Sequence, residues 1–238
     1  MELWINDIYE YVGRGGEVRD VDQALQEHDL IVPCMIALRG GGEAVGREYE
    51  LMLDEARRRM ELAARIRSPY VVATPPREPC EVNQLIDRYG DLLEIGRTVG
   101  IKPTFEYISF FAGAQTLDVA WQVVQQVNDE DATLIPDAFH TWNSPSTEGL
   151  LAEIPAERIS HYHIDDAHPE IPRCQQTDPD RVMIGDGPID LAAEIQVLRD
   201  IGYQGTISLE LFNAELWEKD PLEVAQLGRQ RLETLLNE

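Results

Sequence analysis

Short apolar runs alternate with longer amphipathic segments along the whole chain, and this alternation most restricts the fold. Several of the apolar runs are nearly continuous, as expected for strands of a parallel sheet that helices cover on both faces. The strand-like runs are 1–5, 30–37, 69–73, 102–108, 132–136, 158–164 and 205–211. The helical segments, with apolar residues three and four apart, are 43–67, 83–100, 116–128, 190–202 and 221–236. This order predicts an α/β fold with a parallel sheet and right-handed crossovers.

The length of 238 residues agrees with a (β/α) TIM-type barrel. No linker rich in proline, glycine or serine divides the chain, so we expect one domain, residues 1–238. The pattern contains about seven parallel strands, whereas a complete barrel of this type has eight. Gly100 and Gly202 each precede a strand-like run and are predicted to end helices.

Residues 166–188 form the one long irregular stretch. Its prolines and glycines predict no regular structure there. A loop of this length between a strand and a helix is more often functional than idle.

Composition excludes several classes of protein. The formal net charge is −24, which repels phosphate backbones and disfavours nucleic acid as a partner. No apolar run is long enough to span a membrane, and the N-terminus lacks the basic region of a secretory signal. The three cysteines form neither a disulfide framework nor a zinc motif. We therefore expect an acidic cytoplasmic protein without a membrane partner.

Polar side chains stand at the C-terminal ends of four consecutive strand-like runs, where barrel chemistry takes place. They are Glu106, Asp137, His163 and Glu210. Three carboxylates and one imidazole form an oxygen-dominated site for one divalent metal ion. The donor set favours Mn²⁺, Mg²⁺ or Co²⁺ and could also accept Zn²⁺.

Each of these residues also has a structural interpretation. A lone glutamate at a strand end is usually a solvated loop carboxylate. Asp137 could be a helix N-cap, with His140 incidental. His161 and His163 share a strand face, and His161 could be a hydrogen-bonded core histidine. The metal interpretation rests on four such residues in sequence order.

Four segments resemble the xylose isomerase-like TIM-barrel superfamily of sugar phosphate isomerases and epimerases, the AP endonuclease family 2 type. They read PTFEYISF, LIPDAFHTW, ISHYHIDDA and RVMIGDGPIDLAAEIQVLRDIGYQGTISLELFN, and together the resemblance covers nearly the whole chain. The HIDD sequence and the RVMIGDG segment are most similar to the 2-keto-myo-inositol isomerase group.

The resemblance implies a metal-dependent isomerase or epimerase of a polyhydroxylated ketone or aldehyde, such as a sugar or a keto-inositol. It implies one divalent metal ion held by Glu106, Asp137, His163 and Glu210. The metal would stabilise an enediolate, while Glu106 and Glu210 exchange protons on the two faces of the substrate.

Four further residues are expected near the substrate. By the same resemblance, His140 would hydrogen-bond a substrate oxygen, and Arg181 would bind hydroxyls or help to close the loop over the site. Trp142 and Arg39 lie near strand ends and are expected to line the pocket. A surface arginine in a flexible loop is the alternative interpretation of Arg39.

The sequence departs from the family at its start. The run Glu2, Leu3, Trp4 resembles the family's second strand, so the first βα unit is apparently lacking. A misassigned or truncated start, an open barrel and a second chain that fills the gap are the three explanations. Because exposed strand edges are normally covered, the last explanation favours a homodimer.

Other functions remain open at this stage. A dehydratase of keto-inositols or dehydroshikimate would use the same ligands and the same first proton abstraction. A non-catalytic truncated relative would keep the fold without metal affinity. A three-zinc DNA repair endonuclease on a similar barrel is disfavoured, because the chain has only five histidines and a strong negative charge.

Overall fold

A computed structural model of the chain describes residues 1–39 and 44–237. These residues form two compact units, apart from the gaps just named. Unit 1 comprises Met1–Tyr107, Phe111–Ala114 and Val119–Ile135, and unit 2 comprises Ile108–Phe110, Gln115–Asp118 and Pro136–Glu238. The single domain of residues 1–238 stays a prediction.

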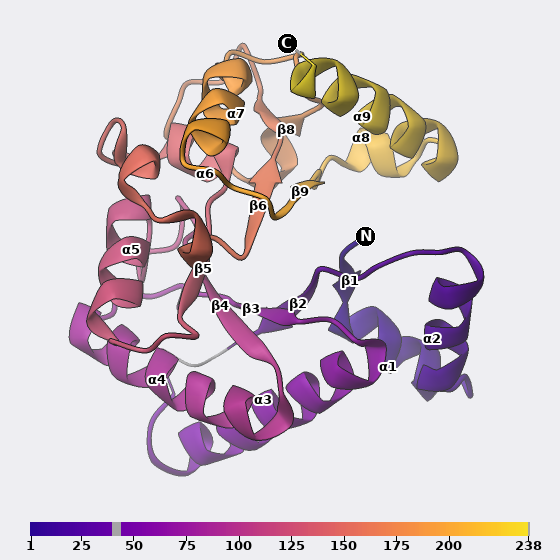
Figure 1. The fold of residues 1–238 in the computed structure, drawn as a ribbon, viewed down its shortest axis with the longest axis vertical. Coiled ribbons are helices and arrows are strands. Elements are labelled where there is room, and N and C mark those ends of the chain that lie inside the picture. Colours follow the sequence, from indigo (N-terminus) through magenta and orange to yellow (C-terminus); the bar gives the residue numbers. More distant parts are fainter. Residues whose placement is uncertain (40–43, 238) are drawn as a thin grey trace. The chain divides into compact units, whose positions relative to one another are not determined.

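The described part of unit 1 contains a five-stranded parallel sheet (Figure 1). Its strands, in spatial order, are β1 (Leu3–Trp4), β2 (Cys34–Leu38), β3 (Tyr70–Ala73), β4 (Lys102–Glu106) and β5 (Thr133–Ile135). The sequence order equals the spatial order, so every crossover connects neighbouring strands. All five strands were expected from the sequence, with wider bounds.

Three helices of this region match the prediction: α3 (Gly46–Ile66), α4 (Val82–Val99) and α5 (Leu117–Gln126). The predicted start of α3 at Glu43 lies outside the described residues. Two helices were not predicted, α1 (Ile5–Gly13) and α2 (Val18–Glu27). α1 buries only Ile5 and Ile8, and α2 only Leu25, so each contributes few apolar residues to a core.

Apolar packing and one tyrosine fix the strands of unit 1. Cys34, Ala37, Val72 and Ile135 form a buried core cluster across the sheet. The hydroxyl of Tyr89 on α4 donates to the Thr133 carbonyl at 2.8 Å and accepts from the Thr133 amide at 3.0 Å. This pair of bonds ties α4 to β5, and the strands are thereby held in register.

The described part of unit 2 contains two small sheets. β6 (His161–Ile164) pairs in parallel with β9 (Thr206–Leu209), and β7 (Asp166–Ala167) pairs antiparallel with β8 (Arg181–Val182). Its helices are α6 (Ala138–Asn143), α7 (Leu191–Asp200), α8 (Ala214–Trp217) and α9 (Pro221–Leu236), with 3₁₀ turns η1 (Leu150–Glu153), η2 (Ala156–Arg158) and η3 (Asp178–Asp180). Figure 1 shows β6 and β9 side by side. With β1–β5, the described residues contain seven strands in parallel pairing, which confirms the predicted number.

The expectation that residues 166–188 lack regular structure is wrong. This stretch contains β7, η3 and β8, because a buried carboxylate ties its backbone together, as described below. The two predicted helix-ending glycines are confirmed: Gly100 and Gly202 both have φ of +76°, the left-handed conformation typical of that position.

Residues 1–39 and 44–237 include no helix with the length and hydrophobicity that a bilayer-spanning helix requires.

Candidate metal centre

Backbone pairing in unit 2 brings three of the predicted ligands to adjacent strand ends. Asp137 forms an isolated parallel bridge with His163, and the His163 amide donates to the Pro136 carbonyl at 3.0 Å. Glu210 directly follows β9, whose Leu209 pairs with Ile164 of β6. The three side chains therefore emerge beside one another.

The side chains of Asp137, His163 and Glu210 form a compact cluster. One ligand atom from each lies within 4.8 Å of the others. Nδ1 of His163 is 3.3 Å from Oε2 of Glu210 and 3.8 Å from Oδ2 of Asp137. His163 and Asp137 are buried, whereas 12% of the Glu210 side chain is exposed. Two carboxylates and one imidazole at this spacing could hold a divalent ion and leave room for a further ligand.

The two oxygens of Asp137 have separate partners. Oδ1 accepts a hydrogen bond from the His140 amide at 2.7 Å and caps α6, so the helix-cap interpretation is confirmed. Oδ2 faces His163 and Arg181. Burial alone would raise the pKa of Asp137, but the charges of Arg181, His140 and His163 and the capping bond outweigh it and lower the pKa to about 2.

The Arg181 guanidinium lies inside the same cluster, with 1% of the residue exposed. Its Nη1 atom contacts Oδ2 of Asp137 at 2.9 Å, Oε2 of Glu210 at 3.2 Å and Oδ2 of Asp165. Burial opposes its charge, yet these carboxylates raise the pKa of Arg181 above its usual value. Arg181 is thus a buried cation among the candidate ligands.

His140 is held by protein atoms on both sides of its ring. Nη2 of Arg181 lies 3.0 Å from Nε2 of His140, and a guanidinium can only donate, so Nε2 is the acceptor. Its other ring nitrogen, Nδ1, lies 3.1 Å from the hydroxyl oxygen of Ser109. Burial lowers the pKa of His140 to about 3, in agreement with a neutral ring. Its expected bond to a substrate oxygen stays a prediction.

Asp166 organises the loop that carries Arg181. Its carboxylate is buried and accepts hydrogen bonds from the amides of Gly185 (3.1 Å), Gly187 (2.9 Å) and Ile189 (3.0 Å). A Cβ atom at Gly187 would lie 2.1 Å from the Ala167 carbonyl oxygen, so only glycine fits this approach. The loop is therefore built around one aspartate.

A second set of bonds holds residues 168–180 of the same loop. The side chain of Gln176 is buried; it donates to the carbonyls of His168 and Ile171 and accepts from the His168 amide. Asn143 on α6 donates to the Gln176 carbonyl at 2.8 Å. At the end of the loop, Asp178 accepts from Nη2 of Arg181 at 3.1 Å. The long loop is thereby joined to the cluster.

Three further residues, Glu106, Arg39 and Trp142, were also predicted to belong to the site. Glu106 is buried at the end of β4 in unit 1, opposite Ile135 of β5. Arg39, also in unit 1, is exposed, with its guanidinium carbon 5.5 Å from the centre of the Trp4 ring. Trp142 in unit 2 is half-buried, and the guanidinium carbon of Arg173 lies 5.4 Å from the centre of its ring. Glu106 and Arg39 belong to unit 1, and the roles of Glu106, Arg39 and Trp142 stay predictions.

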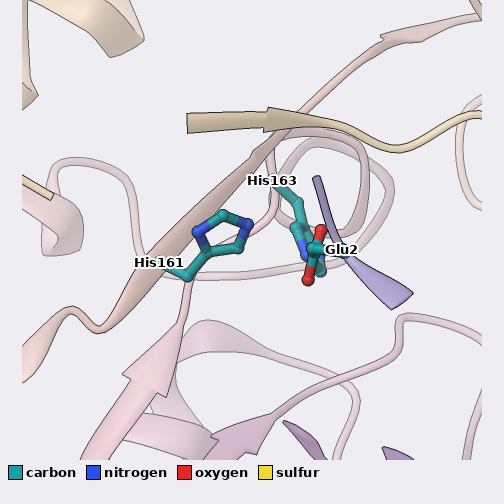
Figure 2. Close-up of side chains that lie close together, drawn as sticks. All are labelled: Glu2, His161 and His163. Atoms are coloured by element: carbon teal, nitrogen blue, oxygen red, sulfur yellow. The ribbon is translucent and has the colours of Figure 1, made fainter. Parts of the chain in front are cut away.

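His161 and His163 project from β6 on the same face, as predicted (Figure 2). Their ring centres are 5.2 Å apart and the rings are nearly perpendicular. Nδ1 of His161 is hydrogen-bonded to the hydroxyl of Thr206 on β9. This is the buried, hydrogen-bonded histidine that the structural interpretation of His161 expects.

Sequence reasoning missed Asp165, Asp166 and Asp178 as functional residues. The signal was present in HIDD, where two aspartates directly follow an apolar strand. Successive residues there face opposite sides, so Asp165 contacts Arg181 and Asp166 contacts the glycine-rich loop.

The charges of the cluster fit a divalent cation. When ionised, Asp137, Asp165 and Glu210 carry three negative charges against the single positive charge of Arg181. Buried charge of one sign is strongly unfavourable without compensation. A bound divalent ion would balance the remainder, and the donor set present is one that such ions accept.

Proteins with similar sequences include inosose isomerases and 3-dehydroshikimate dehydratases. The inosose isomerase of Bacillus subtilis (strain 168) is 28% identical over 186 residues, which cover 75% of this chain and 66% of that protein. The matched part is thus slightly less than two thirds of this relative. The 3-dehydroshikimate dehydratase of Pseudomonas aeruginosa is 25% identical over 219 residues, covering 90% of this chain and 34% of that protein.

A crystal structure of the IOLI protein with a bound zinc atom has a TM-score of 0.91 and 25% sequence identity, and the match covers 99% of this chain and 87% of that one. The family model described as "Xylose isomerase-like TIM barrel" matches residues 4–235. The predicted fold and the resemblance are therefore confirmed. The chain belongs to the xylose isomerase-like TIM barrel family.

Proposed function

We propose that the protein is a divalent-metal-dependent isomerase or epimerase of a polyhydroxylated ketone, most specifically a keto-inositol. The observation that carries this proposal is the buried cluster of Asp137, His163 and Glu210 in a chain of this family. The similarity to an inosose isomerase supports a cyclitol substrate. The zinc atom in the IOLI structure supports a metal-dependent site in a closely similar fold.

Asp137, His163 and Glu210 would hold the metal, with Glu106 as the predicted fourth ligand. When bound, a divalent ion supplies Lewis-acid stabilisation of the negative charge that develops on a carbonyl oxygen. The predicted set of three carboxylates and one imidazole favours Mn²⁺, Mg²⁺ or Co²⁺, and Zn²⁺ is compatible with the one imidazole and two carboxylates of unit 2.

Glu210 is the proposed proton carrier within unit 2. Its side chain is the most exposed of the three ligands, so a substrate can reach it. Nη1 of Arg181, 3.2 Å from Oε2 of Glu210, stabilises the ionised carboxylate, which is the form that accepts a proton. Glu106 is proposed as the second proton carrier, on the opposite face of the substrate.

Arg181 supplies a fixed set of donors beside the metal site. The neutral His140 ring accepts from Arg181, which sets the direction of the guanidinium plane. Phe139 and Phe212 enclose that plane, with ring centres 5.0 and 5.4 Å from the guanidinium carbon. A donor group held in this way can orient substrate hydroxyls without first being ordered.

A dehydratase is the second candidate, because the similarity to 3-dehydroshikimate dehydratase covers 90% of this chain. Both reactions begin with removal of a proton next to a carbonyl group. They differ in whether a hydroxyl group then leaves.

The experiment is incubation of the Mn²⁺-loaded protein with 2-keto-myo-inositol, followed by mass spectrometry and NMR of the product. A product of unchanged mass with a new NMR spectrum supports an isomerase. Loss of one water from the product mass supports the dehydratase. No turnover together with no retained metal would contradict both and support the non-catalytic alternative.

A further inference from the structure

One buried carboxylate beside the candidate metal centre is outside the predicted ligand set. Asp165 lies two residues after His163 and is fully buried. Its Oδ2 atom accepts a hydrogen bond from Nη1 of Arg181, and its Oδ1 atom has no hydrogen-bond partner among the described residues. Burial raises the pKa of the Asp165 carboxyl, and the charge and hydrogen bond of Arg181 act against that rise. Because a buried carboxylate needs a compensating charge, Arg181 is the group that stabilises the ionised form of Asp165.

Arg181 is shared between Asp165 and two candidate metal ligands. Nη1 contacts Oδ2 of Asp137 and Oε2 of Glu210, the same two oxygens that lie nearest to Nδ1 of His163. A metal ion held by Asp137, His163 and Glu210 would also interact with these two carboxylates. The guanidinium and the metal are therefore two cations that draw on the same pair of carboxylates.

We propose that Asp165 is a positioning residue: it holds the Arg181 guanidinium and so leaves Asp137 and Glu210 available to the metal. The inference rests on the proposed function, in which these two carboxylates bind a divalent ion. Two residues outside the ligand set then act on metal affinity in opposite directions. The charge of Arg181 lowers it, and Asp165 raises it.

The surroundings of Arg181 explain why it cannot simply leave the cluster. Phe139 and Phe212 enclose the guanidinium, and Nη2 is bonded to His140 and Asp178. Without the Asp165 charge, Nη1 would stay in place and interact more strongly with Asp137 and Glu210. Asp165 is the carboxylate partner of Nη1 that lies outside the proposed ligand set.

Titration calorimetry with Mn²⁺ on the full chain tests this proposal. Arg181→Met keeps an unbranched side chain between the two phenyl rings and removes the charge, so it should bind Mn²⁺ about tenfold more tightly than the wild type. Asp165→Asn keeps the shape and removes the opposite charge, so it should bind about tenfold more weakly. The matched control is Arg231→Met, since Arg231 pairs with Asp186 outside the cluster. It should bind Mn²⁺ as the wild type does.

Tighter binding by Arg181→Met is the decisive result, because damage to the fold can lower metal affinity but cannot raise it. The double variant Asp165→Asn/Arg181→Met removes both buried charges together. Since Asp165 acts mainly through Arg181, Asp165→Asn should reduce affinity less in this background than in the wild type.

Three outcomes would overturn the inference. Arg181→Met could bind Mn²⁺ no more tightly than a wild type that does bind it, or Asp165→Asn could cost the same affinity with and without Arg181. Either result refutes the role of Asp165 while the proposed function stands. If the wild type binds no Mn²⁺, the proposed metal site is wrong and the inference is wrong with it.

Discussion

The two units of the chain bury different kinds of side chain. The core of unit 1 is apolar, as in the cluster of Cys34, Ala37, Val72 and Ile135, and Glu106 is the one buried carboxylate among its described residues. The described part of unit 2 buries a set of ionisable side chains: Asp137, His140, His161, His163, Asp165, Asp166 and Arg181. Stability and chemistry are therefore concentrated in different parts of the molecule.

The difference is informative because buried charges rarely stabilise a protein. Replacing a buried ion pair with apolar residues of similar volume is often neutral or stabilising. A unit that nevertheless places four carboxylates around the buried Arg181 uses them for positioning and binding rather than for stability; they are Asp137, Asp165, Asp178 and Glu210. In unit 1, by contrast, the core cluster consists of apolar side chains that pack against one another.

The largest expected effects come from one variant in each unit. The variant in unit 2 should lose turnover, and the variant in unit 1 should lose stability. Glu210→Gln should lower turnover by about 10²–10⁴-fold, because a proton carrier and a metal ligand are lost together, with little change in the free energy of unfolding. Met60→Ala removes a fully buried side chain of α3 and should cost about 2–5 kcal/mol of stability with turnover per folded molecule retained. Turnover assays and urea unfolding of both variants measure this.

Glu106→Gln extends the same test to the predicted second proton carrier in unit 1. It should lower turnover as Glu210→Gln does. Wild-type turnover in either glutamine variant would refute the two-base mechanism. A loss of turnover per folded molecule in Met60→Ala equal to that in Glu210→Gln would break the distinction between the units.

Periodicity predicted the strands and the long helices because these elements bury many apolar residues. β4 and α4 were expected nearly where they lie, and Gly100 marks the end of α4. α1 and α2 were missed because each buries one or two side chains. Local patterns therefore fail where an element depends on few tertiary contacts.

The ligands were identifiable from sequence for a different reason. Asp137, His163 and Glu210 follow strands, and parallel strands end at one edge, so their proximity follows from topology. The place of Arg181 could not be predicted, because its conformation depends on Asp165 and on two phenyl rings distant in sequence. Sequence spacing predicts which strand ends lie next to one another, but it does not predict the hydrogen-bond partners of a long side chain such as Arg181.

An intermediate effect on stability is expected at Asp166, where unit 2 uses a charge for structure. Asp166→Asn weakens the acceptor of three loop amides and should cost about 1–3 kcal/mol in urea unfolding, since each bond involves a buried ionised group. Asp186→Asn is the matched control in the same loop. Its side chain is 50% exposed and pairs with Arg231, so its loss should cost less than about 1 kcal/mol. Equal costs would show that burial of Asp166 adds nothing.

The smallest expected effect is a pH dependence that His140 adds to unit 2. Burial lowers its pKa to about 3, whereas the unfolded chain protonates this histidine near its ordinary value of 6.5. Between these two values the unfolded state binds one more proton than the folded state, so stability falls as the pH is lowered through this window. The contribution of one such group is at most about 1.4 kcal/mol per pH unit.

His140→Gln keeps an acceptor for Arg181 and removes the titrating ring. Urea unfolding at pH 7, 6 and 5 should therefore give a shallower decline for this variant than for the wild type, because carboxylates titrate equally in both. Parallel curves would show that the buried His140 ring takes up a proton as easily as an exposed one, which would contradict the neutral tautomer that orients Arg181.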